Sequence, residues 1–200
     1  MFSHVIVKRY ATRELFQVNF RTANNNLLVV VGNHWPSRTG GQYESEPYRI
    51  IAGETLAYFH ERIRQVIGSN DVAVLAMGDF NDEPFSRSLV GYALSDRTRD
   101  KVTRASNPKF LNLMWPILGQ GIGTHYYDNF PNVLDQFLVA KGLITGNSGI
   151  QAILNSAEVV RLPEMVSGGT YPAPIRYGRG SETNPNGFSD HYPIALQLQE

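Results

Sequence analysis

Two short segments of this chain carry residue types that suit metal-assisted cleavage of a phosphoester. They are GDFNDEP at residues 78–84 and SDHYP at residues 189–193, and a third segment, NHWP at residues 33–36, also ends a hydrophobic run with polar groups. Such chemistry needs hard oxygen ligands, an imidazole and a rigid mount. Because the segments are far apart in the sequence, only a fold can bring them together.

The candidate site consists of carboxylate, amide and imidazole side chains, namely those of His34, Asp79, Asn81, Asp135, Asp190 and His191. Asp79 and Asn81 share a strand-like parity, so we expect both to point to one side and to act on a cation or a water. Asp135 stands in the apolar segment 132–138 and needs a partner. We expect it to hydrogen-bond His191, to fix the tautomer of the ring and to raise its basicity.

Mg²⁺ suits this set of ligands, because it takes oxygen donors and often only one or two carboxylates together with waters and a substrate phosphate. The sequence has no cysteine and no His-x-x-x-His pair, so it does not support a structural zinc site. It also lacks the GxxxxGK[ST] loop of nucleoside triphosphatases.

Each candidate also has an ordinary structural interpretation when it is taken alone. Asp79 stands before a turn-forming stretch that it can cap, and Asp190 is equally open to that interpretation. A single histidine such as His34 is more often a hydrogen-bonded structural residue than a catalytic one. Asp135 has the weakest ordinary interpretation, because an aspartate within an apolar strand requires a partner.

Other polar residues are interpreted as structural. We expect Asp82 and Glu83 to be caps, and we expect His60 to be solvated on the surface of a helix. His4 and His125 carry no motif, and we expect both to be structural.

The composition fits one globular domain without a strong electrostatic field. The 200 residues include 18 basic and 18 acidic side chains, and 42% are hydrophobic. A neutral chain lacks the field expected of a nonspecific nucleic-acid binder, and we interpret the basic residues between positions 97 and 109 as a solvated loop. No apolar run approaches the roughly twenty residues of a membrane span, and nothing indicates a compartment.

The elements that must position the candidate residues are mainly strands. Apolar or alternating segments predict strands at residues 4–10, 15–21, 27–32, 72–77, 123–127, 133–140, 150–162 and 192–198. We expect 123–127 to pair with 133–140 across a turn, and 95–109 and 167–188 to be loops.

One helix is clear from the sequence. Apolar residues recur at helical spacing from Ala52 to Val66, Ser45 can cap the start, and Gly68 follows the end. Many strands and one clear helix indicate an α+β fold in which sheet packs on sheet.

Four segments together resemble the endonuclease/exonuclease/phosphatase superfamily. They are NHW at 33–35, GDFN at 78–81, VLDQF at 133–137 and SDHYP at 189–193, and they stand in this order over nearly the whole chain. The superfamily includes pancreatic-type deoxyribonucleases, abasic-site endonucleases, sphingomyelinases and inositol-polyphosphate 5-phosphatases. The longer string NHWPSR at 33–38 resembles deoxyribonuclease-like bacterial members.

The resemblance implies a four-layer α/β-sandwich, in which two packed β-sheets are flanked by helices. It also implies Mg²⁺- or Mn²⁺-dependent hydrolysis of a phosphoester by in-line attack of water. In that mechanism Asp79 orients or deprotonates the water with help from Asn81. His191, held by Asp135, acts as a base or stabilises the phosphoryl charge.

The resemblance implies further roles at the same site. Asp190 joins Asp79 in holding the metal, and Arg38 and Asn81 contact a substrate phosphate. His34 stabilises the transition state or protonates the leaving oxygen, and its presence favours the deoxyribonuclease, sphingomyelinase and phosphatase branches over abasic-site enzymes. The substrate is a nucleic acid, a phospholipid head group or a sugar phosphate, and the neutral charge slightly favours a small or lipid phosphoester.

The N-terminal region departs from the superfamily pattern. There, a strand ending in Asn and a strand ending in a metal-binding Glu precede the segment that contains His34. About thirty residues precede it here, neither motif occurs in them, and Glu14 has the wrong context. We therefore expect residues 1–200 to be the C-terminal portion of one domain, with weak metal binding, little activity alone, and self-association through an incomplete sheet.

Two other functions stay open on the sequence. One is a truncated or binding module that keeps the fold without the chemistry, which the absent Glu favours and the intact candidate set opposes. The other is a nucleic-acid-binding protein without catalysis, which the net neutrality opposes.

Overall fold

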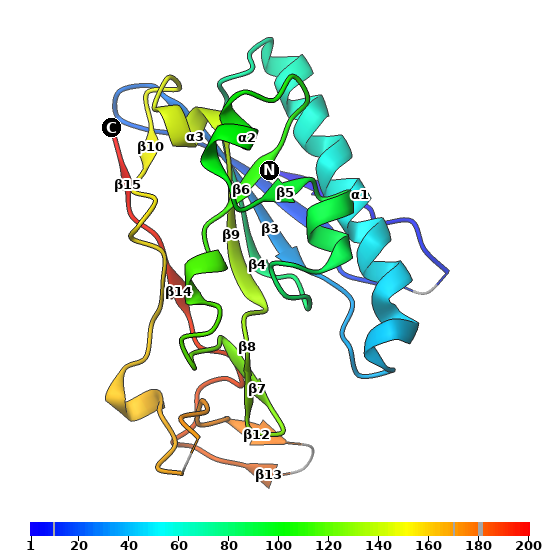
Figure 1. Cartoon of the computed structure of the whole chain (residues 1–200), viewed down its shortest axis with the longest axis vertical. Coiled ribbons are helices and arrows are strands. Elements are labelled where there is room, and N and C mark those ends of the chain that lie inside the picture. The colour runs from blue at the N-terminus through cyan, green and yellow to red at the C-terminus, as the bar shows by residue number, and fades with distance from the viewer. Residues whose placement is uncertain (10, 170, 180–181) are drawn as a thin grey trace.

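A seven-stranded sheet forms the centre of the protein in the computed structural model, which describes residues 1–9, 11–169, 171–179 and 182–200 (Figure 1). Its strands are β1 (Phe2–His4), β2 (Leu15–Arg21), β3 (Leu27–His34), β4 (Ala73–Asp79), β5 (Ser95–Asp96), β6 (Phe110–Asn112) and β9 (Asp135–Ala140). They lie in the order β1-β2-β3-β4-β9-β6-β5.

The register of the central strands brings three candidate residues together. Strands β3 and β4 are parallel and place His34 opposite Asp79, whereas β4 and β9 are antiparallel and place Asp79 opposite Asp135. All three residues therefore lie at the same end of neighbouring strands. Strands β4 and β9 are apolar on both faces, because alternate residues enter two different cores, and this rigid centre fixes the spacing of the three side chains.

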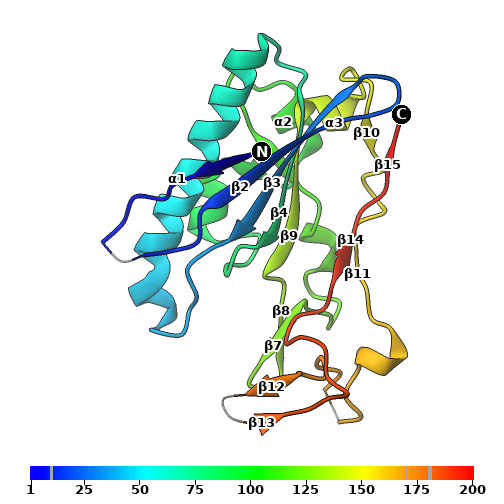
Figure 2. The same ribbon diagram turned by 180° about the vertical axis from the view of Figure 1, so that it is seen from behind.

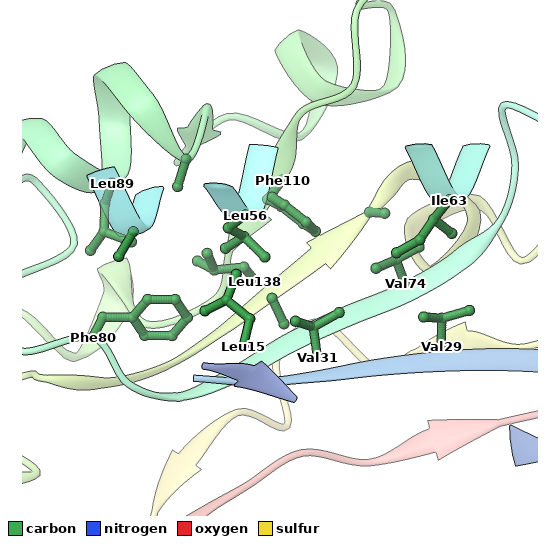
Figure 3. Packing of buried hydrophobic residues seen from close by; sticks show 14 of the residues in the cluster. Leu15, Val29, Val31, Leu56, Ile63, Val74, Phe80, Leu89, Phe110 and Leu138 are labelled. Carbon is green, nitrogen blue, oxygen red and sulfur yellow. The ribbon is translucent and has the colours of Figure 1, made fainter. Parts of the chain in front are cut away.

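The long helix α1 (Gln42–Ile67) is the crossover between β3 and β4 and covers one face of the sheet. Figure 3 shows Leu56 and Ile63 of the helix facing Val31, Val74 and Leu138 of the sheet. The predicted helix is confirmed, but it begins at Gln42, three residues before the predicted start. Ser45 is not its cap: the hydroxyl donates to the carbonyl of Gly41 and accepts from a buried arginine.

The opposite face of the sheet is covered by the C-terminal part of the chain (Figure 2). The helix α3 (Lys141–Thr145) is followed by two short ladders, in which β10 (Gln151–Ala152) pairs with β15 (Leu198–Gln199) and β11 (Glu158–Val159) pairs with β14 (Ile194–Ala195). Ile194, Leu196 and Leu198 all pack into this core, as their alternation predicts. The α+β class with sheet packed on sheet is confirmed.

The other elements are short. They are α2 (Arg99–Thr103), the hairpin of β7 (His125–Tyr127) and β8 (Phe130–Asn132), the pair of β12 (Gly178–Arg179) and β13 (Glu182–Thr183), a π-helical turn at Ser88–Tyr92, and 3-10 turns at Trp115–Ile117 and Pro163–Met165. Among the described residues, no helix is both long and apolar enough to cross a membrane.

Several predicted elements need correction. The strand expected at 4–10 is confined to Phe2–His4, and Tyr10 lies outside the described residues. The segment 133–140 does not pair with 123–127, because β9 fills the centre of the sheet between β4 and β6. The segment 95–109 contains β5 and α2 as well as loop, and 150–162 forms two short strands in place of one.

Candidate functional site

The ends of β3, β4 and β9 carry His34, Asp79 and Asp135 side by side. His34 Nε2 lies 3.6 Å from Asp79 Oδ2, and the His34 side chain is half exposed. The two carboxylates are mostly buried. The structure thus joins at one point residues that are separated by more than a hundred positions in the sequence.

A hydrogen bond joins the C-terminal segment to this end of the sheet. His191 Nδ1 lies 2.7 Å from Asp135 Oδ2, which is the contact predicted from the sequence. Thr124 holds both partners in place. Its hydroxyl accepts from the backbone N–H of Asp135 at 3.0 Å, and its carbonyl accepts from the backbone N–H of Tyr192 at 2.7 Å.

Asn81 contacts Asp79 from a turn, and not from the strand that the sequence analysis predicted for both residues. It lies beyond the end of β4 in the left-handed region, with φ of 50°. Its backbone N–H donates to Asp79 Oδ1 and its side-chain Nδ2 donates to Oδ2, each at 2.8 Å, while Nδ2 also contacts the carbonyl of Trp35 at 3.0 Å. The carboxylate of Asp79 is therefore fixed by its own turn.

The close approach of β3 and β4 beside the site depends on a glycine. Gly78 has φ of 126°, and a Cβ atom there would lie 2.1 Å from the carbonyl oxygen of Asn33. No side chain fits in that space, and the backbone conformation is one that L-residues rarely adopt.

Burial and neighbouring charges shift the pKa values of the site in opposite directions. Burial, followed by the charge of Asp135, raises the pKa of Asp79 to about 6. Burial lowers the pKa of His191, but the hydrogen bond and charge of Asp135 outweigh it, so the net shift is upward. Burial lowers the pKa of His34 and, together with the charge of His191, lowers that of His125 to about 4.

Two overlapping groups of side chains can hold a metal ion. The ligand atoms of Asp79, Asp135 and His191 lie within 4.8 Å of one another, and so do those of His125, Asp190 and His191. Carboxylate oxygens are donors that Mg²⁺ and Mn²⁺ prefer, so the chemistry of the set fits a divalent cation. Asp79 and Asp190, the predicted metal ligands, belong to different groups, and His191 is common to both.

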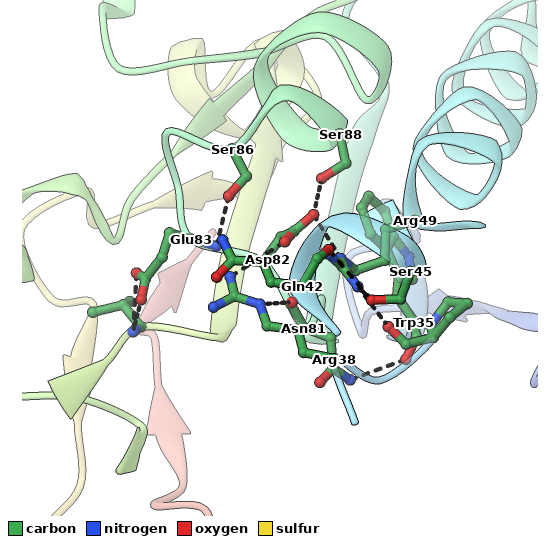
Figure 4. A network of polar contacts seen from close by, with 12 residues as sticks. Trp35, Arg38, Gln42, Ser45, Arg49, Asn81, Asp82, Glu83, Ser86 and Ser88 are labelled. Carbon is green, nitrogen blue, oxygen red and sulfur yellow. Dashed lines mark hydrogen bonds and ion pairs between the residues drawn. The ribbon is translucent and has the colours of Figure 1, made fainter. Parts of the chain in front are cut away.

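A buried ion-pair network supports the turn that carries Asn81 (Figure 4). Arg49 of α1 is fully buried, and its Nε lies 2.8 Å from Asp82 Oδ2 without being aligned for a hydrogen bond. Arg38 Nη2 lies 3.2 Å from the other carboxylate oxygen, and Ser88 donates its hydroxyl to Oδ2. The interpretation of Asp82 as a cap is therefore wrong, because its carboxylate ties the helix to the turn.

Two further residues brace the same turn. Arg38 Nε donates to the carbonyl of Asn81 at 2.7 Å, so the residue predicted to bind substrate also has a structural contact. Glu83 is not a cap either: both carboxylate oxygens accept from the backbone N–H of Val133, at 3.1 and 3.2 Å. The turn after β4 is thus tied to α1 and to the approach of β9.

Three histidines outside the predicted site differ in their surroundings. His4 is structural, as expected, because its Nε2 contacts Gln17 at 2.7 Å. His60 is buried against Phe110, with ring centroids 4.1 Å apart, so its predicted solvation is wrong. His125 lies 4.7 Å from the His191 ring and belongs to a possible metal group, which the sequence analysis missed. No sequence pattern around His125 indicated a role in a metal site.

Several solved structures are similar to this chain. SmcL is 16% identical with a TM-score of 0.53, over 92% of this chain and 57% of that one. A functionally unknown conserved protein from Enterococcus faecalis V583 is 18% identical with a TM-score of 0.49, over 96% and 59%. The human Nocturnin catalytic domain with bound sulfate is 15% identical with a TM-score of 0.48, over 93% and 52%. At these identities, SmcL supports the fold alone.

The chain spans between about half and three fifths of the length of these solved structures. No curated protein matches the sequence at a significant level. A sequence model of one family matches residues 4–200, which is nearly all of the chain. On that match, this chain belongs to the Endonuclease/Exonuclease/phosphatase family.

Proposed function

We propose that this chain carries part of the active site of a divalent-metal-dependent phosphoesterase. The observation that carries the proposal is the pairing of Asp135 with His191 at 2.7 Å, beside Asp79 at the shared end of β4 and β9. Three segments distant in sequence supply these groups. Family membership supports a hydrolase that acts on phosphoester bonds. The assignment to deoxyribonuclease-like bacterial members, based on residues 33–38, stays a prediction.

In this proposal, each side chain has a separate role in in-line hydrolysis. Asp79 orients the attacking water and takes its proton, a role that suits a carboxylate whose pKa is raised to about 6. Asn81 holds that carboxylate in place through both oxygens. Asp135 raises the pKa of His191 and favours its cationic form, which stabilises the charge on the phosphoryl oxygens.

His34 completes the polar set around the reacting phosphorus. Burial lowers the pKa of His34, so the ring is mostly neutral near pH 7 and is better suited to donate a hydrogen bond than to protonate the leaving oxygen. Arg38 binds a substrate phosphate with the donors that its contacts to Asn81 and Asp82 leave available.

Asp79 and Asp190 are the proposed metal ligands, with Asp135 and His191 beside them. When bound, Mg²⁺ or Mn²⁺ supplies Lewis-acid polarisation of the phosphoryl group. The orienting groups belong to the chain itself, since Asp79 and His191 are each fixed by a hydrogen bond to a neighbouring side chain.

We also propose that residues 1–200 form the C-terminal portion of a single domain. The limited coverage of the solved structures supports this, as does the absence of the expected Glu motif upstream of His34. A further metal ligand would then come from the rest of the domain.

Self-association stays a prediction. The edge strand β1 and its neighbour β2 expose Phe2, Phe16 and Phe20, and sedimentation at two protein concentrations tests whether the chain self-associates.

The test is hydrolysis of bis-p-nitrophenyl phosphate with Mg²⁺ or Mn²⁺, by this chain and by any longer product of the same gene, with plasmid nicking alongside. In the active form, we expect Asp79→Asn to lower kcat/KM by about 10²–10⁴-fold. The matched control is Asp128→Asn, in the exposed turn between β7 and β8, which should keep the wild-type rate. A folded Asp79→Asn variant with the wild-type rate contradicts the proposal. Nicking without activity on small esters identifies a nuclease.

A further inference from the structure

A polar cavity lies at the opposite end of the sheet from the candidate site. It has a volume of about 70 Å³ and is lined by His60, Arg64, Asn70, Ser106, Lys109 and Lys141, among others. These residues come from the end of α1, the start of α3 and the loops before β4 and β6, which meet at one end of the molecule (Figure 1). Strand β4 separates this end from Asp79, and seven residues of strand span roughly 20 Å.

The lining of this cavity is positively charged. It includes the side chains of Arg64, Lys109 and Lys141, and none of the described residues that line it is acidic. Two carboxylates lie nearby and offset part of the charge: Glu61 Oε2 is 3.1 Å from Arg64 Nη1, and Asp71 Oδ1 is 3.8 Å from Lys141 Nζ. Lys109 has no ion-pair partner within 4.0 Å in the described part of the chain, and its charge is offset only by the more distant Asp96 carboxylate, so it can attract an anion.

A buried histidine supplies a neutral donor to the same cavity. Only 4% of His60 is exposed, and one face of the ring is stacked on Phe110. Burial lowers the pKa of His60 to about 3, so the ring is neutral and carries one N–H donor and one acceptor nitrogen. Within the described part of the chain, the ring stacks on Phe110 but makes no hydrogen bond. Neither ring nitrogen is buried without a partner, so the ring can reach a ligand or a water in the cavity that it lines.

We propose that this cavity binds a small oxyanion of the phosphate class. The volume exceeds the roughly 10–15 Å³ that one water requires, so it admits a tetrahedral anion of several atoms. Lysine and arginine attract the charge, while His60, Asn70 and Ser106 donate hydrogen bonds to the remaining oxygens. Free phosphate and the phosphate group of a small ester share this chemistry. The cavity is independent of the proposed catalytic function.

The first test is calorimetric titration of the folded chain with inorganic phosphate in the presence of EDTA, which keeps divalent cations away from the candidate active site. We expect Lys109→Met to weaken binding by about tenfold or more. The matched control is Lys101→Met, because the ammonium group of Lys101 lies 3.7 Å from Asp96 and does not line the cavity. Binding by this control should match that of the wild-type protein.

A second variant keeps the test informative if Lys109→Met does not fold. His60→Phe keeps a ring to stack on Phe110 but removes both ring nitrogens, so we expect it to weaken phosphate binding several-fold while circular dichroism stays unchanged. Titration with glycerol 2-phosphate separates the sources of the ligand: tighter binding of the ester identifies a phosphate monoester, and tighter binding of phosphate identifies the free ion. The proposal is overturned if the folded wild-type chain binds neither, or if Lys109→Met and His60→Phe both bind like the wild type.

Discussion

The two faces of the seven-stranded sheet are covered in different ways. On one face, a single 26-residue helix packs on a core whose members include fully buried Trp35, Phe80 and Leu56. On the other face, the cover consists of α3, whose Leu143 and Ile144 are fully buried, and of ladders of two residues per strand, whose Leu196 and Leu198 are only partly buried. Burial of apolar area is the main stabilising term, so the C-terminal strands of this second cover are held less strongly.

This difference divides the candidate site. His34, Asp79 and Asn81 are mounted on the strands and turn that α1 braces, whereas Asp190 and His191 arrive with the thinly covered C-terminal segment. The contacts of Asp135 with His191, and of Thr124 with Tyr192, join the halves. The site therefore depends on docking of the weaker half, and the candidate site should come apart before the sheet is lost during unfolding.

The largest expected effect comes from breaking the ion pair between Arg49 and Asp82, on the face of the sheet that α1 covers. Arg49→Met removes a buried cation whose Nε lies 2.8 Å from Asp82 Oδ2. Without Arg49, the buried Asp82 keeps only the partly exposed Arg38 as a counter-charge, so we expect the free energy of unfolding to fall by about 3 kcal/mol or more. Unfolding in urea measures this change in the free energy of unfolding. Arg62→Met, on the exposed side of the same helix, is the control, and equal stability of the two variants contradicts the brace.

A matched pair of substitutions compares the two covers directly. Leu56→Ala removes a side chain that is only 1% exposed beneath α1, and we expect a loss of about 3 kcal/mol in the free energy of unfolding. Leu198→Ala acts on the partly buried ladder, where we expect a loss of about 1 kcal/mol. Thermal and urea unfolding of both variants provide the measurement. Equal losses show that the faces are equally well packed.

The effect that is smallest at neutral pH concerns acid sensitivity beneath the helix. The pKa of His60 is about 3 in the folded chain, below its ordinary value of 6.5, so the unfolded chain binds the extra proton between these values. Stability from this residue is complete above pH 6.5 and falls as the pH drops towards 3, by up to about 1.4 kcal/mol per pH unit. Unfolding at several pH values should show a shallower slope for His60→Phe. An unchanged slope assigns the acid sensitivity to other groups.

Local patterns were sufficient to predict the strands that mount the first half of the site. The alternation over Leu15–Arg21 coincides with β2, and the apolar runs that end near His34 and Asp79 coincide with β3 and β4 to within two residues. The pairing of Asp135 with His191 was also predictable, because a carboxylate in an apolar strand needs a partner and few histidines are available.

What the sequence did not reveal depends on partners distant in the chain. His60 is buried because Phe110, fifty positions away, stacks on it, and Asp82 is an anchor because Arg49 reaches it from α1. Neither contact leaves a periodic signal. The choice of β4 as partner for β9 is likewise non-local, since the turn before β9 favoured pairing with the nearer segment 123–127.

The requirement for glycine at position 78 bears on how this family can diverge. Because a Cβ atom at Gly78 would lie 2.1 Å from the carbonyl oxygen of Asn33, any other residue must push β3 and β4 apart beside His34 and Asp79. No substitution at position 78 avoids this clash, because every residue other than glycine carries a Cβ atom. When a related protein retains Asp79 but has another residue in place of Gly78, we therefore expect that its candidate site no longer assembles and that the protein is inactive.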